Sequence, residues 1–340
     1  MKKLKKRTKV ILIVLLSLIS VVAIAAGGIY YAAMKQLDKI NYNPLPDDKK
    51  EIGIDENLYN EENAKLKGNY INILLIGIDA RHPEDFARCD TMIVATIDKK
   101  HKKIKLSSIM RDMVVTMEGR GTMEGLNTDR INQSYGYGGA PLTTKVINEN
   151  FKTNVQDYIK IDFSGMEKIV DAIGGVEINV KEAEIPVMNN YIRELSKLQN
   201  DSNPPLVTKA GKQLLNGRQT LGYCRIRYVG NRDFDRTLRQ RNVLTEIFNK
   251  LTKQDIGKII EVISEVLPYV ETSLEKKEII NLAKEITLNG VNKVEQFRLP
   301  LEDKVIYIRN EYFLDWDRKK NLEALHKFIY EEDFDEKVLN

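Results

Sequence analysis

The chain has 340 residues, 42% of them hydrophobic and 30% charged, which allows one large domain or two ordinary ones with a proper core. Its net charge of +4 comes from residues 1–34, which carry six basic and no acidic side chains, whereas the remainder has 47 basic and 49 acidic side chains. A domain that binds nucleic acid usually has a basic footprint of its own. The charge balance therefore argues against a nucleic-acid partner.

The N-terminal segment joins a basic tail, residues 1–9, to an apolar run without a charge, residues 10–34. A run of about 20 or more apolar residues can span a hydrocarbon core of about 30 Å. The basic tail predicts a cytoplasmic N-terminus and an extracellular domain, as in a single-pass type II protein of the cell membrane. A cleaved signal peptide is the alternative, because residues 23–25 read AIA. The apolar run continues past that point and favours an uncleaved signal anchor.

The rest of the chain alternates between strand and helix patterns. Residues 35–68 are polar and without a clean period, and they predict a juxtamembrane stalk. Runs rich in Ile, Val, Thr and Leu predict strands at 71–79, 91–98, 103–110, 155–162, 175–180, 294–300 and 304–310. Apolar spacing predicts helices at 142–151, 163–173 and 236–251, with two or three more before the end. These elements predict a single α/β domain over residues 69–332, with a central mixed sheet flanked by helices.

The first three predicted strands indicate where polar side chains meet. If neighbouring strands are antiparallel, the end of the first, the start of the second and the end of the third share one sheet edge. A crossover connection would break this arrangement. The side chains that would converge are Asp79, Arg81, Arg88, Asp90, Arg111 and Asp112. Carboxylates and phosphate oxygens are typical Mg²⁺ ligands, and Arg engages phosphate through a planar fork, so this edge predicts a site for phosphate and metal.

A second group of arginines lies in residues 223–242, which hold six Arg and no Lys although the chain has 17 Arg and 36 Lys. A strand over residues 224–228 would place Arg225 and Arg227 on one face. Asp235 is predicted as the N-cap of the following helix, whose N-terminus would favour an anion.

On that helix, Arg236, Arg239 and Gln240 share one side. For any single arginine, a solvated surface ion pair is the alternative. Arg232 and Arg241 are assigned no role.

The two cysteines, Cys89 and Cys224, would lie outside the cell in this topology. They could form a disulfide there, but a domain of this size does not need one, and two free, partly buried thiols are the favoured interpretation. The sequence has no CxxC pair and three scattered histidines, so it does not indicate a zinc site.

Several segments, in this order, match blocks of a known family: NILLIGIDAR, RCDTMIVATID, KIKLSSIMRD, RINQSYGYGG, VDAIGGVEINV, LLNGRQTLGYCRIRY and DFDRTLRQRNVL. The chain thus resembles the LytR-CpsA-Psr family of membrane-anchored cell-wall glycopolymer transferases, over about residues 71–251. The resemblance implies transfer of a wall teichoic acid or capsular polysaccharide from an undecaprenyl-diphosphate-linked precursor to peptidoglycan. A phosphodiester would form and polyprenyl phosphate would leave.

The resemblance also implies roles for the polar residues. Asp79 and Asp90 would bind Mg²⁺, with Mn²⁺ as the alternative ion. The diphosphate would be bound by Arg81, Arg88, Arg111, Arg225, Arg227, Arg236, Arg239 and Gln240. Catalysis would involve Arg111, Asp112 and Asp233, with an aspartate as a candidate base.

The sequence departs from the family pattern at Met110, Cys89, Gly222 and Cys224, none of which is a proposed ligand. Two other functions are compatible with the same residues. One is a non-catalytic envelope sensor or regulator that binds polyprenyl phosphates, and the other is a lipid-diphosphate pyrophosphatase with water as acceptor. The cytoplasmic tail, residues 1–9, is too short for a DNA-binding element. The pattern locates neither the lipid tunnel nor the acceptor site.

Overall fold

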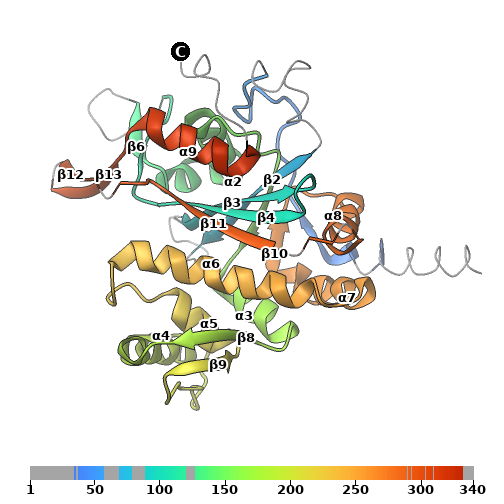
Figure 1. Cartoon of the computed structure of the whole chain (residues 1–340). Helices are drawn as coiled ribbons and strands as arrows, with labels where there is room; N and C mark the ends of the chain where they lie inside the picture. Colours follow the sequence, from blue (N-terminus) through green and yellow to red (C-terminus); the bar gives the residue numbers. More distant parts are fainter. Residues whose placement is uncertain are drawn as a thin grey trace, which may run out of the picture.

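The structure is a computed structural model that describes residues 34–331 except 36, 57–68, 79–88, 120–126, 289, 292, 303 and 309. A mixed sheet of seven strands, in the order β1-β10-β7-β2-β3-β4-β11, forms its centre (Figure 1). The strands are β1 (Asn41–Tyr42), β2 (Tyr70–Ile78), β3 (Cys89–Asp98), β4 (Lys103–Ile109), β7 (Asp157–Ile161), β10 (Val270–Thr272) and β11 (Lys293–Leu299). The pairs β2–β3 and β3–β4 are antiparallel, whereas β2–β7 and β4–β11 are parallel. The predicted α/β fold with a central mixed sheet is thus observed.

Helices cover both faces of this sheet, as Figure 1 shows. On one face lie α2 (Gln133–Phe151) and α9 (Arg318–Tyr330), and on the other lies α6 (Arg232–Leu251). A further layer beyond α6 contains α3 (Phe163–Ala172), α4 (Ile185–Leu198), α5 (Gly217–Cys224), β8 (Val176–Val180) and β9 (Gly211–Leu215). The helices α7 (Ile256–Val266) and α8 (Lys276–Leu288) pack together beside β10.

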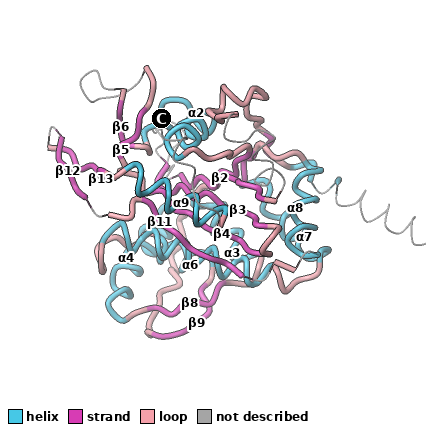
Figure 2. Tube along the Cα trace, turned by 45° about the horizontal axis from the view of Figure 1, so that its top comes forward, coloured by secondary structure: helices cyan, strands magenta, loops and turns pink. Residues whose placement is uncertain are grey.

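Short elements complete the fold. They are η1 (Leu37–Lys39), η2 (Glu182–Glu184), η3 (Leu267–Tyr269), β5 (Val114–Thr116), β6 (Thr128–Arg130), β12 (Lys304–Ile308) and β13 (Glu311–Asp315). Figure 2 shows the β12–β13 pair projecting beyond the main sheet. The amide of Leu314 in β13 donates to the carbonyl of Asp112 at 2.8 Å, which ties the base of this pair to the segment after β4.

The central strands were predictable because both of their faces are buried. In β3, Met92 and Val94 face the core under α2 and α9, while Ile93 and Ala95 face α6. Such strands read as continuous apolar runs rather than as alternating ones. The sequence patterns for β2, β3 and β4 follow from this burial.

The segment 35–68, predicted to be a stalk, is part of the domain over the residues that the structure describes. Strand β1 pairs with β10 at the edge of the sheet. Leu45, Ile52 and Ile54 are buried in the core under α2 and α9. The domain therefore begins before the predicted boundary at residue 69. The described part of the chain has no helix long and apolar enough to cross a membrane; the predicted anchor, residues 10–34, lies outside it apart from Met34.

Residues 224–228, predicted as a strand, instead form the end of α5 and a turn. The helix is set by its start: the Asn216 side chain accepts a hydrogen bond from the Gln219 amide at 2.9 Å, and the Gln219 side chain accepts one from the Asn216 amide at 3.0 Å. Arg225 follows as the C-cap in a right-handed helical conformation. These capping hydrogen bonds favour a helix more strongly than the short alternation of apolar and basic residues favours a strand.

The predicted N-cap of α6 was also wrong. The helix starts at Arg232 with Asn231 as its N-cap, and Asp235 lies within the first turn. The Asp235 carboxylate accepts a hydrogen bond from the Asn231 amide at 3.1 Å. Helix α2 begins at Gln133 and has non-helical backbone angles at Gly138 and Gly139.

Candidate functional site

Three aspartates and three arginines meet where β3 begins and β4 ends. Continuing the register Met92↔Ile109 between β3 and β4 places Arg111 opposite Asp90. Arg111 Nη1 donates to Asp90 Oδ1 at 2.8 Å, which confirms the predicted meeting of these two strand ends. Asp112 follows Arg111 in the chain, and the turn before α6 and the first turns of α6 supply the other three members. The group, here called the Asp90 cluster, consists of Asp90, Asp112, Asp233, Arg111, Arg227 and Arg236.

Asp90 is the centre of this cluster. Besides Arg111, its carboxylate accepts hydrogen bonds at Oδ2 from Arg227 Nη2 at 2.7 Å and from Arg236 Nη2 at 3.0 Å. Burial is the largest influence on the pKa of Asp90 and raises it, but the charges of Arg236, Arg111 and Arg227 together outweigh burial and hold the pKa well below the usual range. Asp90 is therefore an anion at any pH at which the domain works.

Asp233 and Asp112 lie on the other side of Arg111. Asp233 Oδ2 is 3.4 Å from Arg111 Nη2, and Asp112 Oδ2 is 3.3 Å from Arg111 Nε. Burial raises the pKa of Asp112, and the nearby charge of Asp233 raises it further, against the attraction of Arg111. Asp112 is thus a stronger base than an ordinary aspartate, whereas Asp90 is a weaker one.

An apolar cavity adjoins the cluster, between the sheet and helices α3, α5 and α6, with a volume of about 100 Å³. Its apolar lining comes from Leu75, Ile76, Ile78, Ile93, Ile159, Ile161, Phe163, Met166, Leu221, Cys224 and Leu244. Asp90, Arg225, Arg236 and Gln240 line the same cavity, so the apolar surface and the charged cluster are continuous. No sequence signal located this cavity, because each lining residue reads as an ordinary core residue of its own element.

Three polar atoms of the side chains that line the cavity are buried and have no hydrogen-bond partner within the described residues. They are Arg225 Nη1, Arg236 Nε and Gln240 Oε1. The Arg225 guanidinium carbon lies 4.9 Å from the ring centre of Phe163 and 4.8 Å from that of Tyr191, so the side chain is held in place by aromatic faces. A buried donor that finds no acceptor costs about 1–3 kcal/mol. An anionic ligand in the cavity would offset this cost at the two arginines.

The other predicted residues divide into three sets. Asp79, Arg81 and Arg88 lie outside the described residues. Arg225 and Gln240 line the cavity but do not pair with Asp90. Arg239 points elsewhere: its Nε donates to Glu184 Oε1 at 2.8 Å.

Cys89 and Cys224 are free and buried, as the favoured interpretation held. Burial raises the pKa of the Cys224 thiol to about 12, which makes it unreactive although it lines the cavity. The sequence did not indicate that Glu184 is buried and paired with Arg239, since a lone glutamate before a helix usually faces solvent.

Arginines surround a largely buried aspartate next to an apolar cavity, an arrangement that suits an anionic ligand with an apolar part. The chain belongs to the LytR-CpsA-Psr family, because the profile described as the LytR_cpsA_psr family matches residues 29–328. It is 28% identical over 280 residues, 82% of each chain, to a Bacillus mycoides (strain KBAB4) protein named polyisoprenyl-teichoic acid--peptidoglycan teichoic acid transferase TagU. It is 27% identical over 268 residues, 77% of this chain and 75% of the other, to a protein of Staphylococcus aureus (strain COL) named regulatory protein MsrR.

Solved structures share the fold. One, described as TagT bound to LI-WTA, superposes with a TM-score of 0.61 and 25% identity, over 78% of this chain and 90% of that one. Another, described as the LytR-CPS2A-psr family protein YwtF (TagT) with bound octaprenyl pyrophosphate lipid, has a TM-score of 0.57 and 23% identity, over 77% and 91% of the two chains.

Proposed function

We propose that this chain transfers a glycopolymer, of the wall teichoic acid or capsular polysaccharide type, from an undecaprenyl-diphosphate-linked precursor to peptidoglycan. The continuity of the Asp90 cluster with the apolar cavity carries this proposal, because one ligand with a diphosphate and a polyprenyl chain satisfies both. Family membership and the relative named as a teichoic acid transferase support it. The predicted anchor, residues 10–34, would keep an extracellular domain at the membrane beside such a donor.

The arginines would bind the diphosphate of the donor. Arg111, Arg227 and Arg236 are held ready by Asp90, and Arg225 Nη1 and Arg236 Nε are buried donors without an acceptor in the described residues. Guanidinium groups bind phosphate oxygens more specifically than ammonium groups do. Fixed charges of this kind stabilise a phosphoryl-transfer transition state without needing to reorganise.

Mg²⁺, with Mn²⁺ as the alternative, is the proposed cofactor, and Asp90 fits it. Asp90 offers hard oxygen ligands and accepts three hydrogen bonds, which leaves about one of its roughly four lone-pair sites free, on Oδ1. Asp79 would be the second carboxylate. The cation would supply charge neutralisation at the diphosphate when bound.

Asp112 is the proposed base, since its raised pKa suits it to accept the proton of an acceptor hydroxyl. The hydroxyl oxygen of peptidoglycan would bond to the phosphorus that carries the glycopolymer. The bond from that phosphorus to the bridging oxygen would break, polyprenyl phosphate would leave, and a phosphodiester would remain. Arg111, between Asp90 and Asp112, would offset the charge on the transferred group, and Asp233 would hold Arg111 and raise the basicity of Asp112.

The test is to incubate the protein with Mg²⁺, a synthetic lipid-diphosphate glycan and peptidoglycan oligomers. A glycan joined to peptidoglycan supports the proposal. Free sugar phosphate would instead show a pyrophosphatase. Binding of the lipid-diphosphate glycan without any product would indicate a sensor. This alternative is considered because one relative is named as a regulatory protein.

A further inference from the structure

The turn that carries Arg227 is anchored by side chains rather than by its own backbone. It connects α5 to α6, and in the part of the chain that the structure describes no backbone–backbone hydrogen bond involves Arg227, Tyr228 or Val229. Yet Arg227 Nη2 lies 2.7 Å from Asp90 Oδ2 in the cluster. Something outside the turn must therefore fix its position.

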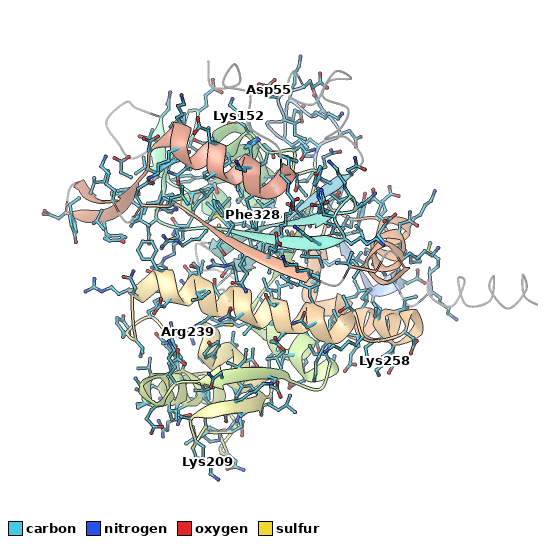
Figure 3. All side chains as sticks on the ribbon, viewed as in Figure 1. Asp55, Lys152, Lys209, Arg239, Lys258 and Phe328 are labelled. Carbon is cyan, nitrogen blue, oxygen red and sulfur yellow. The ribbon has the colours of Figure 1, made fainter. Side chains whose placement is uncertain are left out.

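Arg239 on α6 supplies that support. Its Nη1 donates to the carbonyl of Ile226 at 3.1 Å, and its Nη2 donates to the carbonyl of Val229 at 3.1 Å. These carbonyls lie on either side of Arg227, so one rigid guanidinium spans the turn. In Figure 3, Arg239 lies on the side of α6 toward α4 and α5, away from the sheet.

Glu184 holds this guanidinium from the third side. Its Oε1 accepts from Arg239 Nε at 2.8 Å, and the two side chains are only 2% and 4% exposed. Its Oε2 accepts from the Lys181 amide at 2.9 Å, which fixes the carboxylate where η2 meets α4. The guanidinium of Arg239 thus joins η2, the turn and α6 at one buried point.

We propose that the Glu184–Arg239 pair, here called the strut, is a positioning device that places Arg227 against Asp90 and the donor diphosphate. Arg239 acts through Arg227 and does not itself contact the donor. This inference rests on the proposed transfer reaction and revises the role expected for Arg239. A lysine cannot replace Arg239, because an ammonium lacks the planar fork that reaches two carbonyls and a carboxylate together.

The chain offers a matched control in a second buried pair. Arg218 Nε lies 2.9 Å from Glu167 Oε2, and the two side chains are 8% and 14% exposed. Arg218 also donates to Ser196 Oγ at 2.7 Å. These partners lie on α3 and α4 and not in the Asp90 cluster. Arg218→Lys therefore damages packing of the same kind without touching the turn.

The experiment is a double-mutant cycle in the full-length protein with Arg239→Lys and Arg227→Ala, read as kcat, KM and Tm. Misplacement of a catalytic group by about 1 Å costs on the order of 10²-fold in rate. We expect Arg239→Lys to lower kcat about 10- to 100-fold on its own, and to have little further effect in the Arg227→Ala background. Arg218→Lys should lower Tm by a similar amount while kcat at a temperature below Tm stays near the wild-type value.

Independent, multiplicative losses in kcat would overturn the proposal, because they would mean that Arg239 acts directly or through the fold. The proposal would also be overturned if Arg218→Lys lowered kcat as much as Arg239→Lys does. The same cycle is also read as the Kd for a synthetic polyprenyl diphosphate. If the wild-type protein binds this probe but gives no transfer product, the proposed function fails, and non-additive Kd values still support the strut while additive ones reject it.

Discussion

Strand β3 begins at one cluster of charges and ends at another, and the two are completed differently. The second group, here called the Asp98 cluster, comprises Asp98, His101, Lys103, Lys105 and Glu331. Lys105 Nζ lies 2.8 Å from Asp98 Oδ2, 3.2 Å from Glu331 Oε1 and 2.7 Å from the carbonyl of Ile329. None of the buried side-chain atoms without a partner in the described residues belongs to this cluster.

The Asp90 cluster, by contrast, keeps unpaired buried atoms next to a cavity, at Arg236 and at the neighbouring Arg225 and Gln240. A polar network that the protein completes by itself makes a rigid part of the fold. One that the protein leaves incomplete beside a cavity has room for a ligand to complete it. Unpaired charged groups beside a cavity, and not charge density, therefore distinguish the Asp90 cluster from the Asp98 cluster.

The largest effect on stability is expected from Lys105→Met. The side chains of Lys105 and Asp98 are both fully buried, so the substitution leaves a carboxylate without its cation. Breaking a buried pair on one side costs about 3 kcal/mol or more. Urea unfolding should show this loss, while kcat of the folded protein stays close to wild type. A Lys105→Met protein that is as stable as wild type but inactive would reverse the roles of the two clusters.

Arg111→Ala is the matching change in the Asp90 cluster. Arg111 is partly exposed, so the domain should fold with a Tm near that of the wild type. Removing one preorganised charge from a transition state costs about 10²- to 10³-fold in kcat. The transfer assay measures the loss, and thermal unfolding is its control. Full activity in this variant would contradict the proposed site.

The clusters should also respond differently to acid. The pKa of Asp112 is raised, chiefly by burial, so this proposed base is protonated at a higher pH than an ordinary aspartate. As the pH falls, transfer activity should therefore be lost before the fold is. A raised carboxyl pKa does not cost the fold stability on acidification. The pKa of Asp98 is lowered despite burial, by its bonds to Lys105 and His101, and Lys103 with Lys105 lowers that of Glu331 to about 2.

The stability from Asp98 and Glu331 is therefore present above their unfolded pKa values of about 4 and is lost only as the pH falls through the folded ones. Rate profiles and circular dichroism at the same pH values should show activity lost while the fold remains. If both signals fall together, Asp112 does not set the acid limb of the activity.

The smallest effect expected is that of metal removal on stability. Asp98, His101 and Glu331 could hold a metal ion by their spacing, since their ligand atoms lie within 4.8 Å of one another. The Lys105 ammonium is fully buried within 3.2 Å of both Asp98 and Glu331, and it cannot turn out to solvent as the partly exposed Arg111 and Arg227 beside Asp90 can, so we expect no metal there. Treatment with a chelator should stop transfer, through the proposed Mg²⁺ site, and leave Tm unchanged. A drop in Tm that the Asp98→Asn variant does not show would place a metal in the Asp98 cluster.

Much of the fold could be predicted from the sequence, and for local reasons. The antiparallel order of β2, β3 and β4 predicted that Asp90 and Arg111 would meet, because antiparallel pairing places the start of one strand beside the end of its neighbour. The prediction for residues 224–228 failed because the Asn216 and Gln219 caps start a helix that a short alternation cannot stop. The prediction of a stalk failed because the polar residues around Leu45, Ile52 and Ile54 masked their burial.

By itself, the sequence determined the order of strands and helices, the family blocks and the set of arginines from which a diphosphate site could be built. Only the tertiary structure decided which of them face Asp90, where the apolar cavity lies, and that Arg239 is taken by Glu184, 55 positions away. The physical reason is that a residue's own neighbours in the chain set its helix or strand period, whereas its partner in a buried pair is set by how distant elements pack.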